Sequence, residues 1–274
     1  MSGWWLTGTA AVGAFVAALS VAPSAAAAAP ADAPLDQPDL DAASRVVVVA
    51  DGQTLAHEPY GGAPPLLLLL LATTARLAPG VVVAVSAPLA AGGGAGLGNL
   101  TLGALYAQPV DAATTVGVGA AWTAPTAIFA HAGRIAHAMP REAYRYFEDG
   151  SVAQLHGDAR WRRGALAVQG QLGLEHYLVT DWRDQTLVRA ALAITLRGRL
   201  AVGTLEGTLL TDALDEEYDE GHDVVGATSL GVRVPISGGA LGVHVTYQRS
   251  YEVWSTGGQQ WQFGFDASFP VRWW

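Results

Sequence analysis

Apolar and polar residues alternate strictly in many separate segments of this chain, and this alternation constrains the fold more than any other feature. The last such segment, QQWQFGFDASFPVRWW, has an apolar residue at every second position. These residues are Trp261, Phe263, Phe265, Ala267, Phe269, Val271 and Trp273. Successive side chains of a β-strand point to opposite faces, so the segment predicts a strand with one apolar and one mostly polar face. The apolar face requires a protein core or lipid beside it.

The alternation predicts twelve strands, and the connections between them decide how they are arranged. The strands cover residues 44–50, 66–77, 80–89, 98–108, 114–122, 151–162, 164–178, 186–197, 199–210, 223–235, 240–251 and 259–273. Short connections (APG, PVDAA, RRG, RGR and SGG) take turns with longer ones. An even number of strands joined in this way is typical of bacterial outer-membrane barrels, and a soluble sandwich gives no reason for it. We therefore expect an all-β fold, a transmembrane up-and-down antiparallel β-barrel of about 12 strands with both termini periplasmic.

Composition agrees with a strand-built membrane protein and excludes other classes. Charged residues make up 14% of the chain, against roughly 25% in ordinary soluble domains. The formal net charge of -9 leaves no basic face for phosphates, so we expect no nucleic-acid partner. The chain has no cysteine, so disulfides do not contribute to its stability.

The N-terminus predicts export. An uncharged apolar run from Trp4 to Ala22 precedes several A-x-A sites between Ala25 and Ala29, as in a secretory signal peptide. A retained membrane anchor is the alternative, because the run is nearly long enough to span a bilayer. We assign residues 1–29 to the signal peptide, 30–43 to a flexible periplasmic lead-in and 44–274 to the barrel. The predicted location is the outer membrane of a Gram-negative bacterium.

Two stretches resemble known families. The final strand resembles the terminal signature of bacterial outer-membrane barrels, which the barrel assembly machinery reads, although Trp274 extends it by one residue. The stretch VVVAVSAPLAAGGGAGLGNLTLGALYAQPV resembles the hairpin of predicted transporters of the phenol meta-pathway degradation type, with Asn99 where that family has an acid. The resemblance implies passage of small solutes, aromatic ones included, and names no catalytic residue. Outer-membrane lipid, the assembly machinery and a small-molecule solute are the expected partners.

The phase of the alternation assigns side chains to the two faces of the barrel. Residues predicted to line the lumen are Gln154, His156, Asp158, Arg160, Gln169, Gln171, Glu175, Arg189, Thr195, Arg197, His244, Thr246, Gln262 and Asp266. Residues predicted to face lipid are Leu166, Val168, Leu172, Leu192, Ile194, Trp261, Phe263, Phe265, Phe269 and Trp273. Arg160, Arg189 and Asp158 are the leading candidates for a pore lining. The phase changes near Thr204, which indicates a β-bulge.

Specific phosphate-binding, calcium-binding and catalytic sites have weak support in the sequence. GGGAGLG lacks the Lys and Ser/Thr of a phosphate-binding loop. The acidic run from Asp212 to Asp223 offers calcium ligands without an EF-hand pattern, and a solvated loop is the alternative that we favour. His176 could serve a lipid-modifying enzyme, but no Gly-x-Ser-x-Gly elbow accompanies it. We expect His156 and His244 to form hydrogen bonds in the lumen, with no catalytic residue, metal or cofactor.

The sequence therefore predicts a porin-like outer-membrane channel or facilitator, not an enzyme, that passes small solutes, aromatic or hydrophobic ones included, through a narrow polar lumen. The alternative is a plugged barrel with a structural, adhesive or lipid-modifying enzymatic role. Folding of residues 124–150 into the lumen is left open.

Overall fold

The computed structural model describes residues 37–41, 44–55, 66–91, 95–127, 145, 150–179, 185–212, 224–251 and 259–271. The predicted signal peptide, the acidic run after Asp212, Arg272 and Trp273 lie outside these ranges. In the described part of the chain, no helix is long and apolar enough to cross a membrane.

The described residues form thirteen strands, which belong to one sheet. They are β1 Arg45–Leu55, β2 Leu66–Ala78, β3 Val81–Ala91, β4 Ala95–Leu97, β5 Thr101–Pro109, β6 Thr114–Thr123, β7 Gly150–Arg163, β8 Leu166–Val179, β9 Gln185–Arg197, β10 Val202–Asp212, β11 Val224–Ile236, β12 Gly239–Tyr251 and β13 Gln259–Pro270. Strand β4 is a short addition that pairs with the end of β3, from Leu89 to Ala91.

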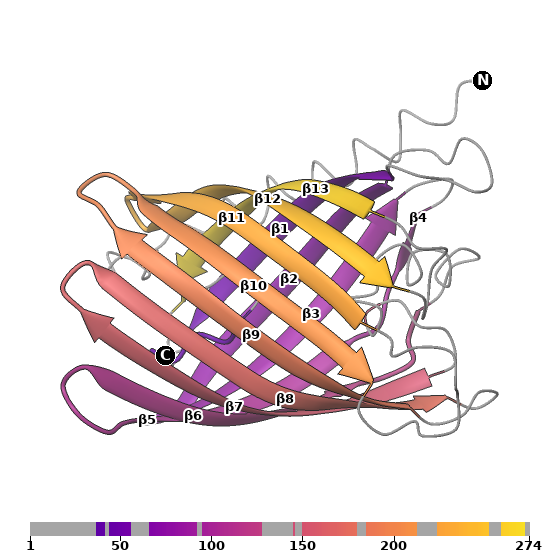
Figure 1. Ribbon diagram of the computed structural model, residues 1–274, viewed down its shortest axis with the longest axis horizontal. Helices are drawn as coiled ribbons and strands as arrows, with labels where there is room; N and C mark the ends of the chain where they lie inside the picture. The colour runs from indigo at the N-terminus through magenta and orange to yellow at the C-terminus, as the bar shows by residue number, and fades with distance from the viewer. Residues whose placement is uncertain are drawn as a thin grey trace.

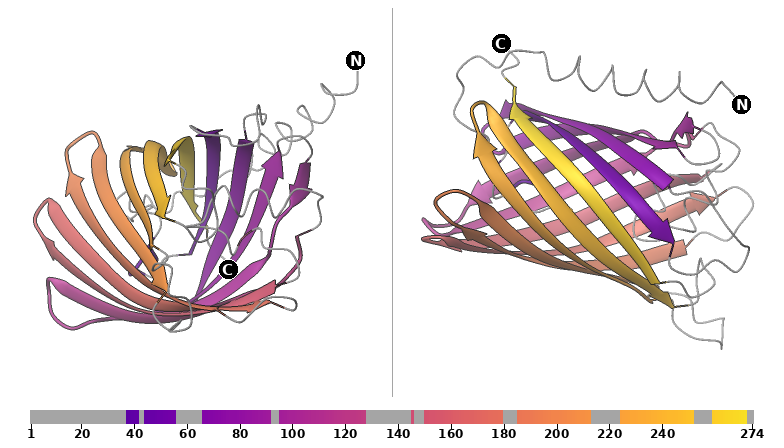
Figure 2. Two further views of the ribbon diagram at one scale, coloured as in Figure 1. Left: turned by 45° about the vertical axis from the view of Figure 1, so that its right-hand side comes forward. Right: turned by 90° about the horizontal axis from the view of Figure 1, so that it is seen from above.

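The other twelve strands close into a barrel (Figures 1 and 2). Neighbours in sequence pair antiparallel, β3 continuing to β5, and the circle is completed where β1 pairs with β13 from Arg45↔Pro270 to Leu55↔Gln260. Closure leaves no open sheet edge among these strands, and an open edge is what lipid does not tolerate. The predicted up-and-down barrel is confirmed.

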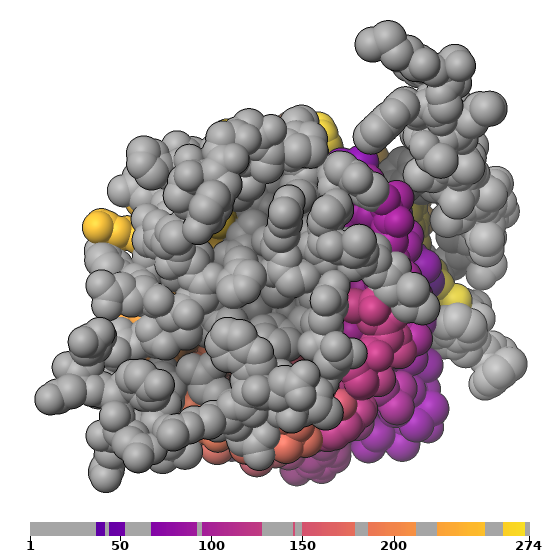
Figure 3. Space-filling model, turned by 90° about the vertical axis from the view of Figure 1, so that its right-hand side faces the viewer, coloured from indigo at the N-terminus to yellow at the C-terminus, as the bar shows by residue number. Residues whose placement is uncertain are grey.

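The two ends of the barrel differ. Tight turns follow β2, β5, β7, β9 and β11 at one end, which we call the turn end and which lies at the left of Figure 1. Gly80, Gly164 and Gly238 in these turns have φ values of 75°, 59° and 84°, which favour glycine. We call the opposite end, where the longer connections begin, the loop end. Figure 3 views the barrel from the loop end, where the strands coloured magenta form one side of the rim.

The outer face of the barrel is apolar. Phe265, Leu172 and Leu192 are 68%, 63% and 53% exposed in the isolated chain. Of the other residues predicted to face lipid, Trp261, Phe263 and Ile194 are also exposed, while Leu166, Val168 and Phe269 are partly buried. Trp273 lies outside the described residues. Exposure of large apolar side chains over so much of the wall is what a lipid-facing band requires.

The bulge predicted near Thr204 is wrong. Strand β10 pairs with β9 and β11 without a register shift along its whole length. The change of phase has another cause: Val202 and Leu210 point inward at the two ends of the strand, with the polar Thr204, Glu206 and Thr208 between them. Apolar residues on the inner face near both ends of the strand therefore interrupt the apolar–polar alternation as a bulge would.

Candidate functional site

The inner wall of the barrel has two unlike halves. Strands β7 to β13 present polar and charged side chains, as the sequence predicts. Strands β2 to β6 present mainly small or aliphatic ones, including Leu68, Val82, Ala90, Leu105 and Ala107, which are all buried, while β1 contributes the charged Arg45 and Asp51. Their neighbours in sequence, such as Leu67, Val85 and Leu102, are exposed on the outer face. The predicted polar lumen thus describes one half of the wall, and the other half is apolar.

The residues predicted to line the lumen lie on the inner face of their strands. Asp158, Arg160, Gln169, Glu175, Thr195, Thr246, Gln262 and Asp266 are buried, and Gln154, His156, Gln171, Arg189 and His244 are partly buried. Arg197 is exposed beside the turn that follows β9. That these side chains line a conducting path stays a prediction.

Charged groups on the inner wall pair with their neighbours. Arg189 Nε donates to Glu175 Oε1 at 2.5 Å, joining β9 to β8, and Tyr177 Oη donates to the other oxygen of Glu175. Asp158 contacts His156 Nδ1 at 2.6 Å and accepts a hydrogen bond from Gln171 Nε2. The partners of Glu175 and Asp158 lie on the same strand or on an adjacent one, so these two carboxylates are paired along the wall and not across the lumen.

A second charged cluster was missed from the sequence. Arg233 Nε on β11 donates to Asp266 Oδ2 on β13 at 2.7 Å, over the intervening strand at Gly242. His244 lies between Asp51 and Asp266, with nitrogen–oxygen distances of 2.8 and 3.7 Å. Arg233 and Asp51 could have been found, because each continues the inward phase of its strand.

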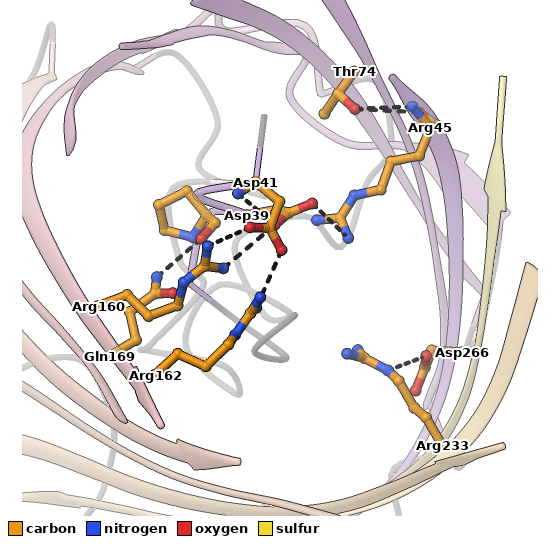
Figure 4. Close-up of polar contacts among 10 residues, drawn as sticks. Asp39, Asp41, Arg45, Thr74, Arg160, Arg162, Gln169, Arg233 and Asp266 are labelled. Atoms are coloured by element: carbon orange, nitrogen blue, oxygen red, sulfur yellow. Dashed lines mark hydrogen bonds and ion pairs between the residues drawn. The ribbon is translucent and has the colours of Figure 1, made fainter. Parts of the chain in front are cut away.

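Residues Gln37–Asp41, which we call the inner segment, lie inside the barrel at the turn end (Figure 4). The sequence predicts a flexible lead-in over residues 30–43, and the structure places these five residues of it against the inner wall. Gln37, Asp39 and Leu40 are buried, and Gln169 Nε2 donates to the Pro38 carbonyl at 2.9 Å. This placement has a physical reason: the carboxylates of this segment find arginine partners on the wall.

Three arginines hold the carboxylates of the inner segment, and we call them the turn-end arginines: Arg45, Arg160 and Arg162. Arg160 Nη2 donates to Asp41 Oδ1, and Arg162 Nη2 donates to Asp41 Oδ2 at 3.3 Å. Arg45 Nη1 lies 3.4 Å from Asp39 Oδ2, and Arg160 Nη1 lies 3.9 Å from Asp39 Oδ1. Burial acts to raise the pKa of Asp41, but the guanidinium groups of Arg160 and Arg162 outweigh it and hold that pKa below its usual value.

The apolar half-wall also receives the inner segment. Leu40 packs with Leu105 and Ala107 of β5 in one buried cluster. Gly117 of β6 makes room for it, because a Cβ atom at this position would lie 2.8 Å from Cδ2 of Leu40. The inner segment therefore contacts both halves of the wall.

Asn99, the departure from the family pattern, has a structural role at the loop end. Its side chain is fully buried, and Oδ1 accepts hydrogen bonds from the backbone N–H groups of Thr126 and Ala127 at 2.9 and 2.8 Å. Asn99 N donates to the Arg145 carbonyl. An amide or carboxylate oxygen thus fixes the start of the connection after β6. Most of residues 124–150 lie outside the described residues, and with them the question, left open by the sequence, of whether they fold into the lumen.

The geometry gives no support to a catalytic role for His176 or to a metal site among the described residues. His176 Nδ1 contacts Thr186 Oγ1 at 2.9 Å on the neighbouring strand. In the described ranges, no group of three His, Cys, Asp or Glu side chains could hold a metal ion. The absence of catalytic, metal and cofactor sites stays a prediction.

The sequence matches no protein-family model and no curated protein, but solved structures are similar in fold. The COG4313 outer membrane channel from Pseudomonas putida F1 has a TM-score of 0.61 at 13% identity, with 87% of this chain and 99% of that chain covered. The NanC porin has a TM-score of 0.55 at 11% identity, with 82% and 100% covered. The CymD monoaromatic hydrocarbon channel has a TM-score of 0.50 at 11% identity, with 84% and 89% covered.

The fold is that of a bacterial outer-membrane β-barrel. At these identities the likeness establishes the fold alone, and it confirms at that level the resemblance found in the sequence.

Proposed function

We propose that the protein is an outer-membrane channel or facilitator for small solutes, with aromatic and hydrophobic molecules among them, and that it is not an enzyme. The observation that carries this proposal is the two-sided lumen. A solute with an apolar body and a polar edge finds Leu68, Val82 and Leu105 on one side and Gln169, Gln248 and Gln262 on the other. Such pairing of apolar surface with a few placed polar groups is the general character of small-molecule sites.

The polar half-wall supports passage of hydrated or polar groups. The side chains of Gln248 and Gln262 are buried. Among the described residues, neither Nε2 nor Oε1 of Gln248 has a hydrogen-bond partner, and Nε2 of Gln262 has none either. Buried polar groups nearly always have a partner, so these amides are suited to bind water or solute. In a core packed only for stability, such amide groups would be expected to form hydrogen bonds with one another.

The alternative remains a plugged barrel with a structural, adhesive or lipid-modifying enzymatic role. One observation favours it: the inner segment lies in the lumen at the turn end. Liposome swelling with benzyl alcohol, glycerol and a disaccharide separates the two. We expect benzyl alcohol and glycerol to pass faster than through protein-free liposomes and the disaccharide to be excluded. Exclusion of every solute by correctly folded protein would favour the alternative.

We further propose that the turn end faces the periplasm and that the final strand is read by the assembly machinery during insertion into the lipid. The chain has no cysteine, so single cysteines report orientation cleanly. We expect a membrane-impermeant maleimide to label Ser255→Cys, in the connection after β12, on intact cells and to spare Ser237→Cys, in the turn after β11. The reverse labelling pattern would overturn the orientation.

A further inference from the structure

We propose that the turn-end arginines form a binding site for the carboxylate of a small organic anion, which Asp39 and Asp41 of the inner segment occupy in this structure. The inner segment is then a tethered competitor, and an anion passes by taking the place of its carboxylates. This inference rests on the proposed channel function and names the solute class.

The three arginines approach the same place from different parts of the barrel. Arg160 and Arg162 extend from β7, and Arg45 extends from β1, which five strand-to-strand pairings separate from β7 by the shorter way round. Figure 4 shows the side chains meeting at Asp39 and Asp41, away from the wall. Among the described residues, these two carboxylates are the ion-pair partners of all three arginines. The site thus lies on the path through the barrel.

The geometry of the occupied site points to a carboxylate. Each oxygen of Asp41 accepts a hydrogen bond from a different guanidinium group, Oδ1 from Arg160 and Oδ2 from Arg162. A planar guanidinium matches the two oxygens of a carboxylate better than a compact ammonium group does. The chain has 15 arginines and no lysine. Arg160 is buried, and a buried charge needs a partner, so an anion must replace Asp41 when the segment leaves.

The inner segment is held by non-covalent contacts, and the ion pairs of Asp41 are within reach of solvent. Besides the ion pairs, Leu40 is buried and Pro38 accepts one hydrogen bond from Gln169. The side chains of Asp41 and Arg162 are 30% and 35% exposed, so a solute can reach them. A short tether gives a competitor an effective concentration in the millimolar range, so we expect an external anion to act at about millimolar concentration.

The apolar half-wall restricts the rest of the ligand. Leu105 and Ala107 pack with Leu40, the residue next to Asp41 in sequence, and would receive an apolar body attached to the carboxylate. The expected ligand is therefore a small monocarboxylate with an apolar or aromatic body, for which benzoate is a suitable probe. Benzyl alcohol is its uncharged counterpart.

The test compares the flux of benzoate and benzyl alcohol into liposomes that contain the full-length protein. The double variant Asp39→Asn and Asp41→Asn keeps the arginines and removes the competing charges. We expect it to raise the benzoate flux by about tenfold, which corresponds to about 1.4 kcal/mol, and to raise the benzyl alcohol flux less. Adding Arg160→Gln and Arg162→Gln to this variant should lower the ratio of benzoate flux to benzyl alcohol flux, because the opening then has no charge at these two positions to attract benzoate.

Arg163→Gln in the same background is the matched control, because Arg163 is an exposed arginine at the same end whose side chain points away from the lumen. We expect it to leave the ratio unchanged. A ratio that does not respond to Arg160→Gln and Arg162→Gln would overturn the carboxylate site and leave the channel proposal standing. Inorganic phosphate that passes as readily as benzoate would show selection by charge alone and also overturn it. If no folded variant passes any solute, the channel proposal itself fails.

Discussion

Leu40 of the inner segment lies over Gly117 of β6, where a Cβ atom would be 2.8 Å from its Cδ2 atom. The contact depends on the absence of a side chain at position 117. A larger residue there must push Leu40 away, because Leu105 and the Tyr106 carbonyl already lie at 3.4 and 3.3 Å from the same point. Docking of the inner segment therefore depends on one glycine of β6, the strand beside β7, which carries Arg160 and Arg162.

We predict that Gly117→Val weakens docking and raises the ion conductance of single channels in planar bilayers. Leu40→Ala should also raise it, because burial of the leucine side chain is lost, at a cost of about 2 to 5 kcal/mol for a substitution of this kind. The double variant should conduct less than either single variant, since the smaller residue makes room for valine. Additive increases would show that the two positions act independently and that the contact does not hold the segment.

The ion pairs of Asp41 make docking sensitive to acid. Its pKa is lowered by Arg160 and Arg162, with Asp39 and Arg45 as the neighbouring charged groups. Docking is therefore fully supported above the usual carboxyl pKa of 3.8 and loses this support as the pH falls through the lowered value. We predict that conductance rises when the pH is lowered through this range and that Asp41→Asn conducts well already at pH 7.

Asp111 provides the control for the acid response. Its pKa is also lowered, because it accepts hydrogen bonds from the backbone N–H groups of Ala113 and Thr114 in an exposed turn at the same end. Its hydrogen-bond partners lie in its own turn and not in the inner segment. Asp111→Asn should therefore keep the rise in conductance in acid, and loss of that rise would assign it to the turn and not to Asp41.

The outer face should reject charge. A charged residue at the bilayer midplane costs about 2 to 4 kcal/mol for Arg or Lys, and Phe265 and Leu192 lie near the middle of β13 and β9. We predict that Phe265→Arg and Leu192→Arg reduce the yield of folded protein in lipid vesicles, measured by the heat-dependent shift in gel mobility. Gln154→Arg, on the inner face of β7, should fold as the wild type does. Equal yields from both faces would mean that the faces are misassigned.

Much of the barrel could be predicted because lipid and lumen impose a period of two on each strand. Phe263, Leu192 and Asp158 point as their phase predicts, and the tight turns fix the strand number. Other information was present but ambiguous. The leucine run of β2 shows no alternation, because Leu67 lies on the outer face and Leu68 lies on the apolar half of the inner face.

The inner segment could not be predicted in the same way. It has no periodicity, and its one proline and two aspartates are typical of a solvated linker. Its decisive partner, Arg160, lies 119 residues from Asp41 in sequence and becomes a neighbour only when the barrel closes. Charge complementarity between Asp39, Asp41 and the lumen arginines was the one available signal, and it is not directional enough to place a short segment.

The pair Arg233 and Asp266 depends on a glycine between them. A Cβ atom at Gly242 would lie 2.4 Å from Asp266 Oδ1 and 2.7 Å from Arg233 Cγ. We predict that Gly242→Val separates the buried pair and destabilises the barrel by about 3 to 5 kcal/mol, the usual cost of breaking such a pair. The midpoint of urea unfolding in detergent measures the loss.

Gly226→Val is the matched control for this prediction, because a Cβ atom at Gly226 on the outer face of β11 meets nothing within 4 Å. It introduces the same side chain into a neighbouring strand and should leave the unfolding midpoint close to that of the wild type. Asp266→Asn should reproduce much of the loss seen with Gly242→Val, since it leaves Arg233 buried without its carboxylate. If Gly242→Val and Gly226→Val unfold alike, the pair contributes little and the glycine at position 242 serves another purpose.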